Sequence, residues 1–298
     1  MRRALVFAVL AACGDDGGGL ADAAIDAVPG CACTYAAAQV SGTIGQSGLK
    51  ELSGVASSLT MTGTVWSHED GSRSVIYAFA TNGATKGLVQ LLGVTTTDIE
   101  DIAAATCAGG SCVYVGDIGD NLVTRTVVQI YEFPEPATIN GTVSITPTKY
   151  DIVYPDGAHN SEALFVDPRN GTSYAITKQT TNPSTVFAMP RTAGVTATAT
   201  SAGTVTIPSG DKQITAADFH ADSCGAKLLI RTFDALYEVR GGPQATLAEL
   251  LAMPLVKVPV LLETQGEAAG YAPDGRGYYT VSEEPSGTPP KLTHVACQ

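Results

Sequence analysis

The feature of this sequence that most constrains its fold is a weak repeat with a period of about fifty residues. Each copy begins with a polar residue and continues into small and apolar residues. The copies are Glu51–Ala56, Glu100–Ala105, Glu162–Asp167, Thr215–His220 and Glu267–Ala272. Repeats of this length without helical periodicity are typical of β-propellers. We therefore predict an all-β chain, folded as a five-bladed β-propeller with four antiparallel strands in each blade.

The two ends of the repeat array predict how the ring closes. The fifth repeat ends after strands at Gly277–Val281 and Lys291–Val295, so it lacks a fourth strand. A spare strand, Gln39–Ile44, precedes the first repeat. Because an unpaired sheet edge invites association with other chains, we expect this N-terminal strand to complete the last blade.

The other strands are expected where β-branched and aromatic residues lie between turn residues. The last strand of the second repeat is predicted at Val143–Tyr154, and that of the third at Thr196–Ile207. Thr246–Ala252 has a helical pattern, and we place it as an insertion in the fourth blade.

The first residues match an export signal for a lipoprotein. Two arginines precede the apolar run Ala4–Ala12, and Leu10–Cys13 matches the lipobox, in which the cysteine is acylated. The apolar run is too short to span a hydrocarbon layer of about 30 Å. We predict a signal peptide at 1–12 and a lipid anchor on Cys13, which would hold the protein to a bacterial membrane on the exported side of the cell envelope. An ordinary secretory signal with a chance cysteine is the alternative.

The segment after the lipobox is expected to be a tether. Gly14–Gly19 is rich in glycine and aspartate and offers nothing to bury. We assign 13–38 to the lipidated cysteine and a flexible tether, and 39–298 to the propeller domain.

Cysteine usage indicates disulfides. The chain has seven cysteines, and six remain if Cys13 is lipidated. An even number in an exported chain favours disulfide pairing. Cys107 and Cys112 flank two glycines, which predicts a bridge across a hairpin turn. Neighbours one residue apart rarely bridge each other, and the spacings do not match a zinc site. We therefore expect each residue of the first pair to bond one residue of the second: Cys31 and Cys33 with Cys224 and Cys297.

Charge and composition exclude some functions. The net charge of −12 argues against nucleic-acid binding, which needs a basic surface. It suits an acidic exterior that attracts cations. A lectin-like propeller would need repeated aromatic pockets, and only 6% of the residues are aromatic. We expect a monomer.

Propeller topology predicts one polar face. The loops that enter the innermost strands and those that join the second and third strands lie on the same side of the ring. That face is expected to carry His68, Glu69, Asp70, Asp117, Asp120, Asn121, Arg125, His159, Asn160, Lys178, Asp234, Glu283 and Glu284. We expect an unidentified ligand or protein partner to bind there.

Carboxylates are expected to converge on the axis. Glu51 or Ser53, and then one residue from the start of each later repeat, should lie near the mouth of the central channel. Carboxylates in such surroundings require a shared cation or protonation. Oxygen ligands with many carboxylates favour Ca²⁺ over a transition metal. A water-filled channel ringed by hydrated carboxylates is the alternative.

This register resembles that of the soluble calcium-activated nucleotidases (apyrases), five-bladed propellers with a central calcium ion. Glu51–Ser53 is similar to the family's Glu-Leu-Ser, Val113–Gly116 to part of its second blade, and Ser161–Ala163 to its third. The family's ligands alternate as Ser, Glu, Glu, Ser, Glu. The resemblance therefore implies calcium ligands at Ser53, Glu100, Glu162, Thr215 and Glu267. The family's aspartate-rich segment and tryptophan-bearing loops have no counterpart in this sequence.

A second acidic motif, Gly116–Asn121, has two interpretations. Its two aspartates and asparagine, spaced by glycine, can wrap a divalent ion or form Asx turns that shape a loop. If the protein is an enzyme, the candidate catalytic residues are Asp117, Asp120, His159 and Lys178.

Two functions remain open from the sequence. The first is a calcium-stabilised binding module, and we favour it. The alternative is a calcium-dependent phosphoester hydrolase, nucleotidase-like or phytase-like, which would require the four candidate catalytic side chains to converge near the ion. The sequence contains neither a Gly-x-Ser-x-Gly elbow nor a phosphate-binding P-loop.

Overall fold

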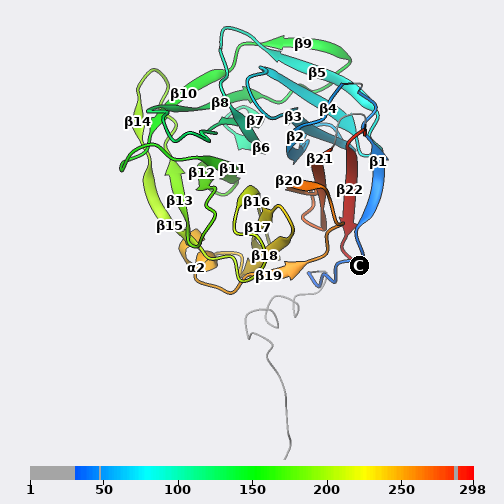
Figure 1. Cartoon of the computed structure of the whole chain (residues 1–298). Coiled ribbons are helices and arrows are strands. Elements are labelled where there is room, and N and C mark those ends of the chain that lie inside the picture. The colour runs from blue at the N-terminus through cyan, green and yellow to red at the C-terminus, as the bar shows by residue number, and fades with distance from the viewer. Residues whose placement is uncertain (1–30, 47, 285–287) are drawn as a thin grey trace, which may run out of the picture.

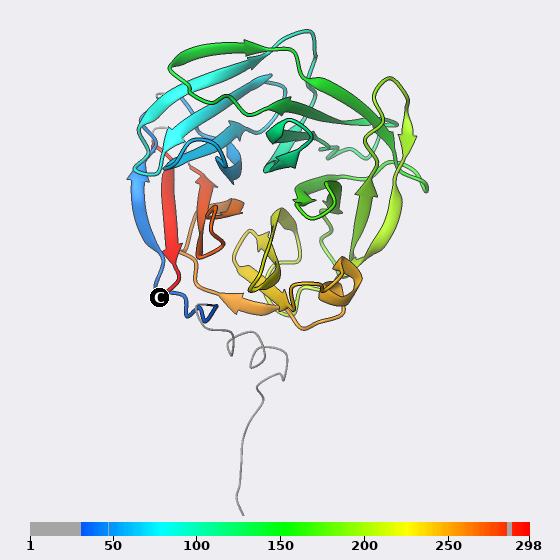
Figure 2. The same ribbon diagram turned by 180° about the vertical axis from the view of Figure 1, so that it is seen from behind.

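The computed structural model describes residues 31–46, 48–284 and 288–298. It confirms the predicted architecture: five small sheets stand around a common axis as the blades of a β-propeller (Figure 1). The view from behind shows the same ring, with the innermost strand of each sheet nearest the centre (Figure 2).

Each blade has four antiparallel strands, which follow one another from the axis outwards. Blade 1 contains β2 (Leu52–Ser57), β3 (Thr64–Glu69), β4 (Val75–Ala80) and β5 (Thr85–Leu91). Blade 2 contains β6 (Ile99–Cys107), β7 (Gly110–Asp117), β8 (Val128–Pro134) and β10 (Thr148–Val153). Blade 3 contains β11 (Ser161–Asp167), β12 (Thr172–Thr177), β13 (Ser184–Met189) and β15 (Thr200–Val205). Blade 4 contains β16 (Ile214–Asp222), β17 (Gly225–Thr232), β18 (Leu236–Gly241) and β19 (Val256–Val258). Blade 5 contains β20 (Gln265–Tyr271), β21 (Gly277–Glu283), β22 (Lys291–Ala296) and β1 (Gln39–Thr43).

The N-terminal strand closes the ring, as predicted. β1 pairs antiparallel with β22, with Gln39 opposite His294 and Thr43 opposite Lys291. The last blade is therefore built from both ends of the described chain, so the closing contact cannot form until the whole propeller sequence is present.

Two short strands also join the sheet of the preceding blade, and on this point the sequence prediction was wrong. The expected strand Val143–Tyr154 is two strands, interrupted at Pro147, which lacks an N–H for strand pairing. The first, β9 (Gly141–Ile145), pairs parallel with β5 of blade 1. The second, β10, completes blade 2.

The predicted strand Thr196–Ile207 divides in the same way. β14 (Ala197–Thr198) pairs parallel with β10 of blade 2, and β15 completes blade 3. The expected helical insertion is confirmed as α2 (Leu247–Leu251), which is capped by the Thr246 side chain and buries Leu250 against the core between blades 3 and 4.

The core consists of apolar layers between adjacent blades. Phe165 of blade 3 stacks on Phe219 of blade 4, with ring centroids 6.1 Å apart. Trp66 is fully buried in the layer between blades 1 and 2.

The six cysteines of the described chain form three disulfides. Cys107–Cys112 spans the turn between β6 and β7, as predicted. Cys31 bonds Cys224, and Cys33 bonds Cys297. Cys13 and the predicted signal peptide lie outside the described residues. No helix in the described part of the chain is long and apolar enough to cross a membrane.

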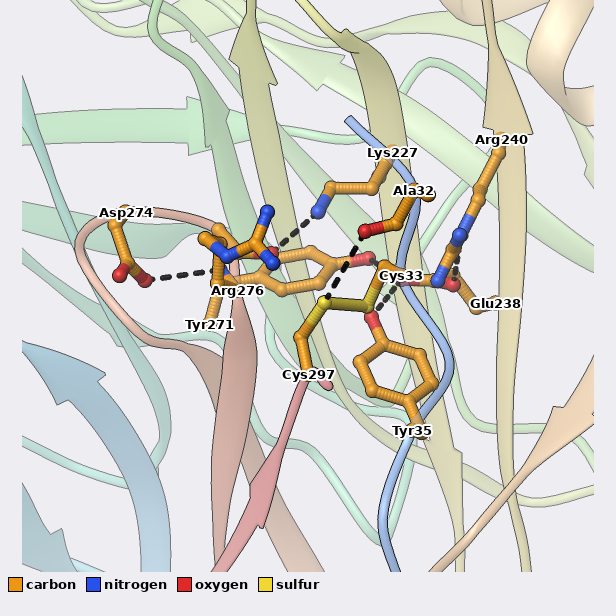
Figure 3. Close-up of a disulfide and its surroundings, with 11 residues drawn as sticks. Ala32, Cys33, Tyr35, Lys227, Glu238, Arg240, Tyr271, Asp274, Arg276 and Cys297 are labelled. Atoms are coloured by element: carbon orange, nitrogen blue, oxygen red, sulfur yellow. Dashed lines mark hydrogen bonds and ion pairs between the residues drawn. A yellow bond between two sulfur atoms is a disulfide. The ribbon is translucent and has the colours of Figure 1, made fainter. Parts of the chain in front are cut away.

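The tether prediction needs correction at its C-terminal end, because residues 31–38 are held against the domain. Besides the two disulfides, the Ala36 N–H donates to the Ala296 carbonyl over 2.9 Å. The Tyr35 hydroxyl donates to Glu238 over 2.6 Å, and the Tyr271 hydroxyl donates to the same oxygen over 2.8 Å (Figure 3). The domain therefore includes residues 31–38 and does not begin at Gln39.

We predict that the two long-range disulfides stabilise the ring more than the hairpin disulfide does. Cys31–Cys224 and Cys33–Cys297 join residues 193 and 264 positions apart, whereas Cys107 and Cys112 are 5 apart. A longer loop loses more entropy when closed, so the variant Cys31→Ser/Cys33→Ser should lose about 2–5 kcal/mol in unfolding free energy.

Urea denaturation measures this loss, with Cys107→Ser/Cys112→Ser as the matched control. The control should lose clearly less. Equal losses in the two variants would contradict the prediction.

Candidate functional site

A β-bulge recurs near the start of every innermost strand. In each, the pairing with the second strand skips one residue. A bulge leaves one residue unpaired and redirects its side chain. The skipped residues are Ser53, Glu100, Glu162, Thr215 and Glu267, which are the five residues predicted from the repeats. None of the five is more than 4% exposed.

Four of these five side chains line one cavity of about 350 Å³. They are Ser53, Glu100, Glu162 and Glu267. The other lining residues come from loops and strand ends on the same face, namely Glu51, Asp70, Gly71, Asp98, Asn121, Lys178, Gln265 and Glu283. The expected convergence of Glu100, Glu162 and Glu267 is therefore present, and we call this space the axial cavity.

The two hydroxyl residues of the set hold blades together. Ser53 Oγ donates to the Glu100 carbonyl over 2.8 Å, which joins blades 1 and 2. Thr215 Oγ1 donates to the Gly266 carbonyl over 2.9 Å, which joins blades 4 and 5. Thr215 does not line the axial cavity, so the ring of five is incomplete there.

The tightest carboxylate group lies on the side of blades 1 and 2. One oxygen from each of Asp70, Asp98 and Glu100 lies within 4.8 Å of the others. A Cβ on Gly119 would lie 2.1 Å from Glu100 Oε1 and 2.5 Å from Asp98 Oδ2, so glycine is required beside this group. Asp98 was missed by the sequence analysis, because it lies in the loop before β6 and has no place in the repeat register.

The described part of the protein supplies few hydrogen bonds to these carboxylates. Glu100 is 3% exposed, and within the described residues no hydrogen bond to its carboxylate is found. Asp70 Oδ1 is buried and has no hydrogen-bond partner in the described structure. A buried carboxylate without donors is costly unless it binds a proton or a cation.

Lys178 is the cationic side chain of the axial cavity. Its Nζ lies 2.5 Å from Glu162 Oε2, and Asn160 donates to Glu162 Oε1 over 3.2 Å. No other lysine or arginine lines the cavity within the described chain. Glu162 is therefore paired, while Glu100 is not.

Burial and repulsion between like charges raise the pKa values of several acids that line the axial cavity. Burial, and then repulsion by Glu162, raise the pKa of Glu267 to about 8. Burial, followed by repulsion from Asp98, raises the pKa of Asp70 to about 7. The pKa of Glu100 is also raised, by burial first and by Glu162 second. In the absence of a cation, part of this cluster therefore holds protons near neutral pH.

The candidate catalytic residues do not all reach the axial cavity. Lys178 lines it, but Asp117, Asp120 and His159 do not. Asp117 is fully buried, accepts the Asp98 N–H over 2.9 Å and pairs with Arg125 at 2.9 Å.

The other two have local partners as well. Asp120 accepts the Arg125 N–H over 2.6 Å within its own loop, so Asp117 is the aspartate of the Gly116–Asn121 motif that contacts Asp98. His159 pairs with Asp156 at 2.8 Å. The catalytic assignment remains a prediction.

A further carboxylate ties the innermost strands together next to the cavity. Asp101 is 1% exposed, and its Oδ2 accepts the Leu164 N–H over 2.8 Å and the Ala217 N–H over 3.3 Å. This one side chain connects blade 2 to blades 3 and 4. Asp218 similarly accepts the Tyr271 N–H of blade 5 over 2.7 Å.

Comparisons with known proteins show no family for this chain. No protein-family model and no curated protein sequence matches it. Among solved structures, it is similar to the PQQ-bound aldose sugar dehydrogenase of Streptomyces coelicolor, with 10% identity, a TM-score of 0.49, and coverage of 90% of this chain and 99% of that one. U3-55K matches with 9% identity and a TM-score of 0.39, over 82% of this chain and 67% of that one. The functional proposal therefore rests on the axial cavity alone.

The raised acid pKa values predict how stability depends on pH without divalent cations. A carboxyl with a higher pKa in the folded state stabilises the fold when protonated, and this stability is lost as the pH rises. For Glu267 the loss should extend from about pH 5 to its folded pKa of about 8. The expected decrease in unfolding free energy is on the order of 2–4 kcal/mol.

Urea titrations of chelator-treated protein at several pH values measure this loss. Glu267→Gln serves as the control, because it removes one of the titrating groups and should make the decrease smaller. Stability that is constant or rises over this range in the wild-type protein would contradict the expectation.

Proposed function

We propose that this protein is an exported, calcium-stabilised β-propeller whose acidic face binds a ligand or partner. The observation that supports it best is the group formed by Asp70, Asp98 and Glu100, whose oxygens lie within 4.8 Å of one another. Glu100 is 3% exposed and has no partner among the described residues, so a bound cation would stabilise its charged form. Several carboxylate oxygens and no nitrogen or sulfur ligand favour Ca²⁺. The ion would supply positive charge and cross-link the loops of blades 1 and 2.

The proposed ion position differs from the one implied by the nucleotidase resemblance. That resemblance uses one residue from each blade, including Thr215 and Glu162. In this chain Thr215 does not line the axial cavity, and Glu162 is paired with Lys178. We therefore assign the first ligands to Asp70, Asp98 and Glu100, and treat Ser53 and Glu267 as further ligands on the axis.

A binding role is better supported than phosphoester hydrolysis. A hydrolase of this kind needs a positioned base and cationic groups for the phosphate. Asp117 and Asp120 are engaged with Arg125, and His159 lies outside the axial cavity. Lys178 is left as the single cationic group of the described cavity, and it is engaged with Glu162.

The proposal includes anchoring through a lipid on Cys13, and the fold gives the anchored protein an orientation. Cys31 bonds Cys224, which lies in the turn after β16. The axial cavity lies at the other end of the innermost strands, where Ile214 begins the same strand. A tether that leads to Cys31 thus joins the domain on the face opposite the cavity. The acidic mouth would point away from the membrane, towards ligands in the surrounding compartment.

We predict that calcium raises the melting temperature of the wild-type protein. Binding to the folded state stabilises it by about 2.7 kcal/mol when free calcium is 100 times the dissociation constant. Asp98→Asn should weaken calcium binding at least about tenfold, because it removes one of three clustered charges.

Thermal melts with calcium and with chelator, and calorimetric titration, measure the two effects. The matched control is Asp274→Asn, an exposed aspartate in the turn between β20 and β21, on the opposite face, which should leave calcium binding unchanged. Identical melting temperatures in calcium and chelator would rule out the proposed ion.

A further inference from the structure

Lys178 has a position that the proposed ion alone does not explain. It follows β12, and its N–H donates to the Asn160 carbonyl over 2.9 Å, which fixes the start of the side chain. The ammonium reaches Glu162 at 2.5 Å, and the side chain is 15% exposed. It also lies over the ring of Phe233, with Nζ 4.5 Å from the ring centroid.

The axial cavity contains many carboxylates and one ammonium group, that of Lys178, in its described lining. The cavity is lined by carboxylates from Glu51, Asp70, Asp98, Glu100, Glu162, Glu267 and Glu283. Lys178 is the single opposing charge among the described lining residues. Without a bound cation, it reduces the repulsion between Glu162 and the other acids. With a divalent cation a few ångströms away, the same ammonium becomes unfavourable, because like charges repel strongly at low effective dielectric.

We propose that Lys178 is a tethered counter-ion that competes with the bound cation, an inference that rests on the proposed function. In the empty site it holds Glu162. When a divalent cation enters, the ammonium moves away from Glu162, and that carboxylate becomes available to the ion. The ammonium already lies over the aromatic face of Phe233, so it can keep this favourable contact when its ion pair with Glu162 opens. The competition lowers affinity and makes the cation exchangeable.

The test measures calcium affinity by isothermal titration calorimetry after removal of divalent cations. Lys178→Met removes the competing charge and keeps the aliphatic stem, so calcium should bind about tenfold tighter or more. Lys178→Arg retains the charge and should bind close to the wild-type affinity. Lys257→Met, at an exposed position on β19, is the control for loss of a surface charge.

A second measurement compares the melting temperatures of wild type and Lys178→Met without divalent cations. Without its counter-ion the chelated Lys178→Met protein should melt at a lower temperature than wild type, and calcium should raise its melting temperature by more. If Lys178→Met does not fold, Lys178→Gln serves instead, since its amide can still donate to Glu162 without a charge.

The outcomes separate this inference from the function on which it rests. Calcium affinity that is unchanged or weaker in Lys178→Met, with wild-type protein that binds calcium, overturns the competing role of Lys178 and leaves the calcium site intact. Wild-type protein that binds no calcium overturns the proposed function itself.

Discussion

The constraint on which the structure depends is the desolvation of carboxylates on the propeller axis. Glu100, Glu162 and Glu267 are each at most 4% exposed, yet they meet in one cavity. Burial of several acids so close together is unfavourable unless protons, paired cations or a bound ion offset the charge. The chain supplies one paired cation, Lys178, and leaves Glu100 without a partner among the described residues. The need for a further positive charge is therefore built into the fold.

The fold holds this unfavourable arrangement in place by several connections between blades. Five repeated bulges turn one side chain per blade out of the regular pleat. Ser53 and Thr215 donate to carbonyls of the next blade, and Asp101 accepts N–H groups from two other blades. The short strands β9 and β14, β1 and the two long-range disulfides close the ring from outside. A rigid frame allows the cavity to keep its shape while its charge state changes.

The architecture could be predicted from the sequence because each copy of the repeat corresponds to one blade. The period predicted the blades, the missing fourth strand predicted the role of Gln39–Thr43, and the polar residues chosen from the repeats proved to be the bulged ones. Asp70 and Asp98 could not be selected in the same way, because loop residues have no repeat register. The approach of Asp98 to Glu100 also depends on Gly119. The roles of Thr215 and Asp117 depend on partners from other blades and loops, which no local pattern reveals.

The most direct test of the central claim is a crystal structure of the protein grown with calcium, with anomalous difference maps recorded at long wavelength. The account predicts one strong peak with oxygens of Asp70, Asp98 and Glu100 at about 2.3–2.6 Å, the range for calcium ligands. It also predicts that Lys178 has moved away from Glu162. An axial cavity without anomalous density at saturating calcium, with Lys178 still paired, would contradict it.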